Sequence, residues 1–119
     1  MRIYEYLIMS DRVYELHAEV CRILGSANRI KILEALQDKE KSVGEISEAL
    51  GLRQANVSQH LAVMRSKGVL KTRKVGTTIY YSVSNPKIVQ ACDLMRQVLL
   101  EQLKENENLV LLVSNPKRG

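Results

Sequence analysis

The sequence predicts a mainly α-helical domain that carries one small β-hairpin, and three observations support this. Apolar residues recur at three- and four-residue steps through most of the 119 residues, as they do on the inner face of helices. The stretch "VLKTRKVGTTIYYSV" (69–83) is instead rich in Val, Thr, Ile and Tyr around a central glycine, which is typical of two strands and a turn. Capping residues precede the helical segments, and glycines follow several of them.

The first half of the chain predicts two helices. Ser10-Asp11 is a good N-cap for the first helix, and Gly25-Ser26 ends it. Its expected inner face comprises Val13, Leu16, Val20, Ile23 and Leu24. The second helix runs to the charged stretch "DKEK", and its expected buried stripe is Ile30, Leu33 and Leu36. Residues 1–9 form an apolar N-terminal extension that could be either helix or strand.

The segment "SVGEISEALG" (42–51) predicts a short helix with both ends marked. Ser42 and Glu45 fit a capping box, and Gly51 fits a C-terminal stop. We expect Val43, Ile46, Ala49 and Leu50 to face inward. Leu52 and Arg53 then lead into another helix that ends at Gly68. Two short helices joined by such a tight turn form a helix-turn-helix.

The remaining segments complete a winged helix-turn-helix within residues 10–105. The hairpin should turn around Val75-Gly76-Thr77 and form the wing. Asn85-Pro86 predicts the start of a last helix that continues to about Lys104. Its apolar stripe is Ile88, Cys92, Met95, Leu99 and Leu103. The apolar tail, residues 106–119, could also extend a helix or form a strand.

The helix in "RQANVSQHLAVMR" (53–65) has an unusual polar face. Val57, Leu61 and Met64 supply its buried stripe, but the rest is short, uncharged and able to form hydrogen bonds. Such residues suit the reading of base edges in the major groove, where Gln and Asn can pair with adenine. The candidate base readers are Gln54, Asn56, Ser58 and Gln59. We expect His60 to be packed and hydrogen-bonded inside the domain instead.

The basic residues surround this helix. The net charge is +5, and residues 53–74 include six basic residues but no acidic one. We expect Arg53, Arg65, Lys67, Arg73 and Lys74 to contact phosphates of double-stranded DNA. A merely solvated basic face is the alternative, as is a winged helix that binds another protein. One winged helix reads few base pairs, so we expect a homodimer formed through the first and last helices.

Several other classes of protein are disfavoured. No apolar run is long enough to cross a membrane, and the N-terminus lacks the pattern of a secretory leader. The two cysteines are too few for a disulfide framework, so we expect a cytoplasmic protein with reduced thiols. No glycine-rich phosphate loop or firmly spaced cluster of metal ligands is present, so we expect no enzyme activity.

The segments "LGSANRIKILEAL", "SVGEISEALGL" and "ANVSQHLAVMRSKGVLKTRKVGTTIYYSV" closely resemble the arsenical-resistance and metal-responsive repressors, the ArsR/SmtB family. The resemblance implies a dimeric winged-helix transcriptional repressor that releases operator DNA when an effector binds. It places DNA contacts at Gln54, Ala55, Ser58 and Gln59, and in the wing from Arg73 to Thr78. Thr77 and Thr78 are therefore candidate wing contacts. Arg53 stands where the family often has a capping serine or threonine.

The resemblance does not identify the effector. Ser42 and Gly44 occupy the positions of a Cys-x-Cys metalloid site, and Glu34 occupies that of a redox cysteine. The positions matching a zinc or nickel site on the last helix are Asn85, Lys87, Val98 and Glu101. His17 and Cys21 share a helix face, and Cys92 could join them in a zinc or arsenite site. A thiol switch and simple packing of the cysteines are the alternatives.

Overall fold

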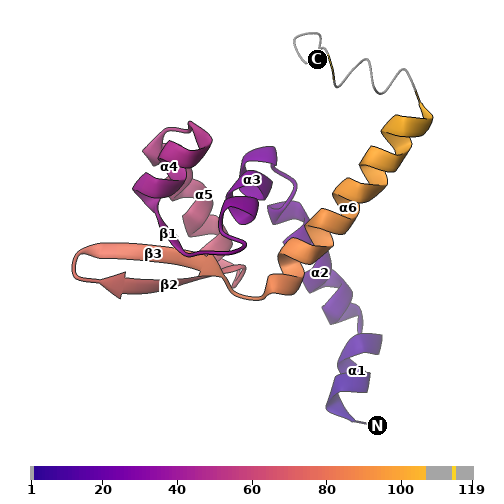
Figure 1. Ribbon diagram of the computed structural model, residues 1–119. Coiled ribbons are helices and arrows are strands. Elements are labelled where there is room, and N and C mark those ends of the chain that lie inside the picture. Colours follow the sequence, from indigo (N-terminus) through magenta and orange to yellow (C-terminus); the bar gives the residue numbers. More distant parts are fainter. Residues whose placement is uncertain (1, 107–113, 115–119) are drawn as a thin grey trace. The chain divides into compact units, whose positions relative to one another are not determined.

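The computed structural model describes residues 2–106 and Ser114, and it contains two units that meet at Pro86 and Lys87. The first unit holds five helices and three strands, and the second holds most of the last helix (Figure 1). The elements are α1 (Ile3–Met9), α2 (Asp11–Ile23), α3 (Ala27–Ala35), β1 (Lys41–Ser42), α4 (Val43–Leu50), α5 (Gln54–Ser66), β2 (Leu70–Val75), β3 (Thr78–Val83) and α6 (Pro86–Glu105). The predicted winged helix-turn-helix is confirmed, with one more helix and one more strand than expected.

The predicted helix starts are confirmed by their caps. The Ser10 hydroxyl accepts a hydrogen bond from the Val13 backbone N–H at 3.4 Å, and α2 begins at Asp11. The Ser26 hydroxyl accepts in the same way from the Arg29 N–H at 3.4 Å, where α3 begins. Residues 3–9, which could have been helix or strand, form α1, and Ser10 alone separates α1 from α2.

The wing belongs to a three-stranded antiparallel sheet in the order β1-β3-β2 (Figure 1). The turn between β2 and β3 contains only Gly76 and Thr77, and Gly76 has a φ of 62°. A glycine with positive φ at the first of two turn positions is typical of a type II′ hairpin. The edge strand β1 was not predicted, because its two residues are too few to show an alternating pattern.

The core of the first unit lies among α3, α4, α5 and the start of β2. The predicted stripe of α5 is confirmed, since Val57, Leu61 and Met64 are 0% exposed. The other side chains of the first unit that are at most 7% exposed are Ile23, Ile32, Leu33, Leu36, Ile46, Val69 and Leu70. This set makes one continuous support for the surface of α5 that faces solvent.

Three predicted inner faces need correction. Ala49 is exposed, because the buried side of α4 is centred on Ile46 and extends toward Val43 and Leu50. Ile32 is fully buried although it lies outside the predicted stripe of α3, and Ile30 is only half-buried. Leu16 of α2 is 44% exposed. Of these three helices, α3 has a buried face that is wider than the single predicted stripe, because Ile32 and Leu33 are both buried.

The helix α6 begins at Pro86 as predicted and ends at Glu105. Arg96 forms an ion pair with Asp93 one turn earlier in the helix. Two members of the predicted stripe, Met95 and Leu99, are 63% and 51% exposed in the single chain. Most of the predicted tail lies outside the described residues. Among the helices that the structure describes, none has both the length and the apolar character needed to cross a membrane.

Candidate nucleic-acid interface

The turn between α4 and α5 is short and internally bonded. Gly51 adopts the left-handed conformation, with a φ of 66°, and ends α4 as predicted. The Leu52 N–H donates to the Ser47 carbonyl at 3.2 Å, and the Ser47 hydroxyl donates to the Leu52 carbonyl. Ser47 thus binds Leu52 of the turn through both its backbone and its side chain. These two hydrogen bonds fix the orientation of α5 relative to α4.

The outer face of α5 is polar, small and free of carboxylates. The exposed residues of this face are Gln54, Ala55, Asn56, Ser58, Gln59 and Ala62. Because the opposite stripe is fully buried, the backbone of α5 is held firmly while these side chains remain accessible. Arg53 precedes the helix in an extended conformation and forms no side-chain cap. The first N–H groups of α5 therefore have no side-chain acceptor from the N-cap residue.

His60 lies at the border of this face and has an internal partner, as predicted. Its Nδ1 accepts a hydrogen bond from Arg29 Nε at 3.1 Å, and Arg29 Nη1 donates to the Ile23 carbonyl at 3.0 Å. Arg29 thus links the end of α2 to the middle of α5. Sequence reasoning missed Arg29, because it lies 31 positions from His60 and no local pattern joins them.

The predicted phosphate contacts fall into two groups. Arg53, Arg65 and Lys74 are exposed around α5 and on β2. Lys67 and Arg73 instead form ion pairs with carboxylates from other parts of the chain, Glu19 of α2 and Glu40 respectively. The hydrogen bond from Lys67 lowers the pKa of Glu19. Neither carboxylate was among the predicted site residues, because both lie outside the acid-free stretch.

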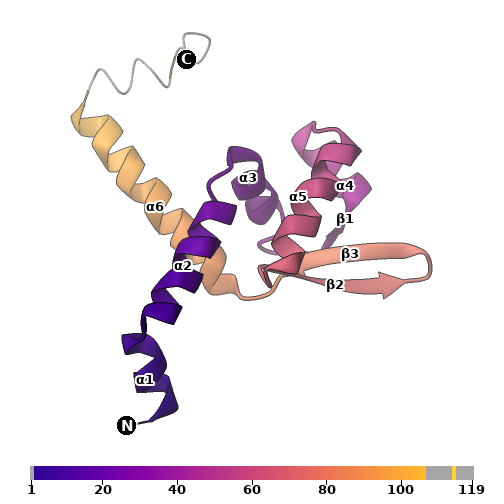
Figure 2. The same cartoon turned by 180° about the vertical axis from the view of Figure 1, so that it is seen from behind.

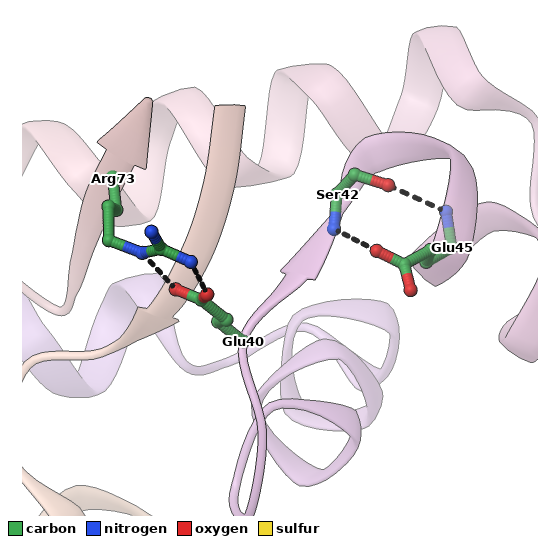
Figure 3. Close-up of polar contacts among 4 residues, drawn as sticks. All are labelled: Glu40, Ser42, Glu45 and Arg73. Atoms are coloured by element: carbon green, nitrogen blue, oxygen red, sulfur yellow. Dashed lines mark hydrogen bonds and ion pairs between the residues drawn. The ribbon is translucent and has the colours of Figure 1, made fainter. Parts of the chain in front are cut away.

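The Arg73–Glu40 pair is bidentate, as Figure 3 shows. Arg73 Nε donates to Glu40 Oε2 at 3.1 Å, and Arg73 Nη2 contacts Glu40 Oε1. The guanidinium carbon also lies 5.7 Å from the centre of the Tyr80 ring. These hydrogen bonds lower the pKa of Glu40 and raise that of Arg73, so both groups stay charged in the folded protein.

The predicted capping box of α4 is confirmed (Figure 3). The Ser42 hydroxyl accepts from the Glu45 N–H at 3.2 Å, and the Glu45 carboxylate accepts from the Ser42 N–H at 3.0 Å. The Ser42 N–H, which donates to the carboxylate, is the largest cause of the lowered pKa of Glu45. Ser42 therefore ends β1 and caps α4 at the same time.

We expect Ser42→Ala to destabilise the domain by about 1 kcal/mol, because the Glu45 N–H loses its acceptor. Ser42→Thr keeps an oxygen at this position and should stay closer to the wild type. The lowered pKa means that Glu45 stabilises the fold when ionised, so this contribution should be present near neutral pH and be lost as the pH falls through the lowered pKa of this carboxyl group. Urea unfolding at several pH values measures both effects. An unchanged midpoint for Ser42→Ala would show that the cap contributes nothing.

The wing presents its tip to solvent. Thr77 lies in the turn and Thr78 begins β3, and both are exposed together with Lys74. Figure 2 shows the hairpin extending as an arm beyond α4 and α5, all within the first unit. The predicted wing contacts are thus accessible, and the sheet that supports them is continuous with β1 at the start of α4.

The predicted sensor residues come from two helices of the chain. His17 and Cys21 are exposed on α2, one turn apart, and Cys92 is half-buried on α6 in the second unit. Within the described parts of one chain, no three His, Cys, Asp or Glu residues come together as possible metal ligands. Of the two positions that correspond to a Cys-x-Cys pair, Ser42 caps α4, and Gly44 lies beside Gln54, whose Nε2 would be 3.7 Å from a Cβ there.

Fold and site together define a winged helix-turn-helix domain of the DNA-binding type, with α5 in the position of the recognition helix. Residues 26–72 match the bacterial regulatory proteins of the arsR family. An uncharacterised HTH-type transcriptional regulator, Rv0081 of Mycobacterium tuberculosis, is 38% identical over 97 residues, 81% of this chain and 85% of that protein. The chain belongs to the arsR family, as its sequence predicted, and is a transcriptional regulator.

Other relatives agree with this assignment. The transcriptional repressor PagR of Bacillus anthracis is 37% identical over 95 residues, which are 79% of this chain and 90% of PagR. The solution structure of the homodimeric winged helix-turn-helix DNA-binding domain of Mb0332 from Mycobacterium bovis superposes with a TM-score of 0.71 at 28% identity. That match covers 82% of this chain and 94% of the other. These relatives are named as regulators of transcription and not as enzymes.

Proposed function

We propose that the protein is a repressor that binds double-stranded operator DNA as a homodimer and reads it with α5. The observation that carries this proposal is the outer face of α5, which is small, polar and free of carboxylates over a fully buried stripe. Small residues let the helix backbone approach the base edges, and the amides supply paired donors and acceptors. The proposed base-reading residues are Gln54, Ala55, Asn56, Ser58 and Gln59.

Contacts with the DNA backbone would set the register of the domain. Arg53 and Arg65 flank α5 at its two ends, and Lys67 follows the second end while it also binds Glu19. Lys74, Thr77 and Thr78 would reach an adjacent phosphate from the wing. Such contacts release counterions, so the affinity should fall steeply as salt rises. DNA binding also implies that the protein acts in the cytoplasm.

The proposed dimer forms through the first and last helices of the winged domain, α2 and α6. The large apolar side chains of α6 that are exposed in the single chain and lie on or beside its predicted stripe include Met95, Val98 and Leu99. On α2, Tyr14 and Leu16 are exposed as well. A regulator of this size seldom leaves so many apolar side chains in water, and the homodimeric Mb0332 domain has the same fold.

The effector that would release the DNA is a separate part of the proposal. His17 and Cys21 are accessible on α2 and have side chains that bind zinc or arsenite, whereas Cys92 lies within the apolar stripe of α6. Titration of the reduced protein–DNA complex with zinc and with arsenite, repeated with Cys21→Ser and Cys92→Ser, tests this part. Release that either substitution abolishes assigns that thiol to sensing, and continued binding assigns the cysteines to packing.

The binding test begins with selection of duplexes from a random pool, followed by fluorescence anisotropy on the selected sequence. We expect Gln59→Ala to reduce the preference for the selected base pair by about 1–3 kcal/mol, because one base edge loses its partner. Lys74→Gln is the matched control on the backbone side. It should weaken all sequences alike and reduce the slope of log affinity against log salt by about 0.9 for each bound subunit.

A winged helix that binds another protein is the rival function, and it requires an exposed apolar surface on α5. Among the described residues, none of the exposed large apolar side chains lies on α5. Weak DNA binding that ignores salt, with no sequence enriched by selection, would favour the rival and contradict our proposal.

A further inference from the structure

We infer that Arg73 is a positioning residue: it is bound to Glu40 and holds the wing against the strand that leads into α4, and it does not contact a DNA phosphate. The inference rests on the proposed function, because the placement of the wing matters through the DNA affinity that it produces. It also gives Glu40 a role, although this residue lies outside every segment that contacts DNA in the proposal.

The sheet places the two side chains on one face. Tyr80 in the central strand β3 pairs with Arg73 of β2 on one side and with Ser42 of β1 on the other. Glu40 precedes Ser42 by two positions, and alternate residues of an extended chain point the same way. The Arg73 guanidinium therefore lies over the Tyr80 ring of β3. It reaches Glu40, which directly precedes the far strand β1, and Figure 3 shows this Arg73–Glu40 contact.

This arrangement joins three elements through one pair of side chains. Glu40 comes directly before β1, and β1 ends at Ser42, whose hydroxyl caps α4. The outer strand of the wing is thereby connected to the residue at which the helix-turn-helix begins. The Arg73–Glu40 pair therefore limits how far β2 and β3 can move relative to α4 and α5. A fixed position of the wing allows the wing and the recognition helix to contact the DNA at the same time.

The hydrogen bonds of the Arg73 guanidinium favour a positioning role for this residue and not a phosphate contact. Arg73 uses Nε and Nη2 on the Glu40 carboxylate, and bidentate pairs of this type are stronger than single ion pairs. A phosphate would have to replace a carboxylate that already satisfies this geometry. Lys74, the next residue of β2, is exposed and supplies a positive charge to the same strand.

The sign of one substitution tests the inference. Removing the negative charge of Glu40 should strengthen DNA binding if charge alone matters, or if Glu40 merely holds Arg73 away from a phosphate. If Glu40 positions the wing, Glu40→Gln should instead weaken binding about two- to fivefold, the range expected for an exposed ion pair. The exchanged pair, Glu40→Arg with Arg73→Glu, should return the affinity to within about twofold of the wild type.

Salt dependence and NMR complete the experiment. Arg73→Gln should lower affinity with an unchanged salt slope, whereas Lys74→Gln should lower the slope by about 0.9 for each bound subunit. The Arg73 Nε–H resonance should keep its position when DNA binds and shift in Glu40→Gln.

Two results would overturn the inference alone. One is stronger DNA binding by Glu40→Gln, and the other is a smaller slope of log affinity against log salt for Arg73→Gln. If Lys74→Gln and Gln59→Ala also leave DNA binding unchanged, the proposed function fails with it.

Discussion

Replacing Leu99 by glutamate should convert the protein into a monomer and weaken its binding to a two-fold symmetric site about a hundredfold or more. Leu99 is 51% exposed in the single chain and belongs to the apolar stripe of α6. If α6 lies in the dimer interface, the substitution places a charge where the partner supplies apolar side chains. Each remaining monomer could then hold only half of the site, and the gain from simultaneous binding of two subunits would be lost.

Analytical ultracentrifugation measures the change in oligomeric state, and anisotropy with full and half sites measures the change in affinity. Gln90→Glu is the matched control, because it adds the same charge to α6 on the side opposite Leu99. It should remain dimeric and bind normally. A Leu99→Glu protein that stays dimeric, with circular dichroism showing an intact α6, would exclude this part of α6 from the interface.

The second large effect concerns stability. Leu61→Ala should reduce the free energy of unfolding by about 2–5 kcal/mol, because Leu61 is 0% exposed and its removal leaves a cavity beneath α5. A domain of this size has roughly 5–15 kcal/mol in total, so the variant should unfold at much lower urea concentration. Urea unfolding at one fixed protein concentration measures the loss, since dimer formation also contributes to stability.

The exposed neighbour Gln59 provides the comparison for Leu61. Gln59→Ala should change stability by no more than about 0.5 kcal/mol, although it alters base preference. The two variants of one helix thus separate the face that holds the domain together from the face that reads DNA. Equal stability of Leu61→Ala and the wild type would contradict the assignment of Leu61 to the core.

What could be predicted from the sequence was local. The caps at Ser10 and Ser42 were recognisable because a capping residue and its partner are three positions apart, whereas Ser26 was interpreted only as part of the end of the preceding helix. The stripe of α5 was recognisable from its helical spacing, and its polar face from residue type. Residue type and spacing were therefore enough for the order of the later helices and the hairpin and for the candidate base-reading residues, but not for α1 or β1.

What could not be predicted depends on residues that meet across the fold. Arg29 and His60 are 31 positions apart, and Glu40 and Arg73 are 33 apart. No periodicity connects such pairs, so Glu40 was interpreted only as part of a charged run. For the same reason, Lys67 and Arg73 were both predicted to contact phosphate, although each of them binds a carboxylate.

The direct passage from β1 into α4 has a consequence for how this domain can change in evolution. Ser42 is both the last residue of the strand and the cap of the helix, so no loop separates them. An inserted residue here would move the strand register and the helix cap together, and it should be rejected. The two residues of the wing tip, Gly76 and Thr77, only connect β2 to β3, and neither of them caps a helix. Longer or shorter wings, and with them new spans of DNA, should therefore arise at the tip, where insertions disturb least.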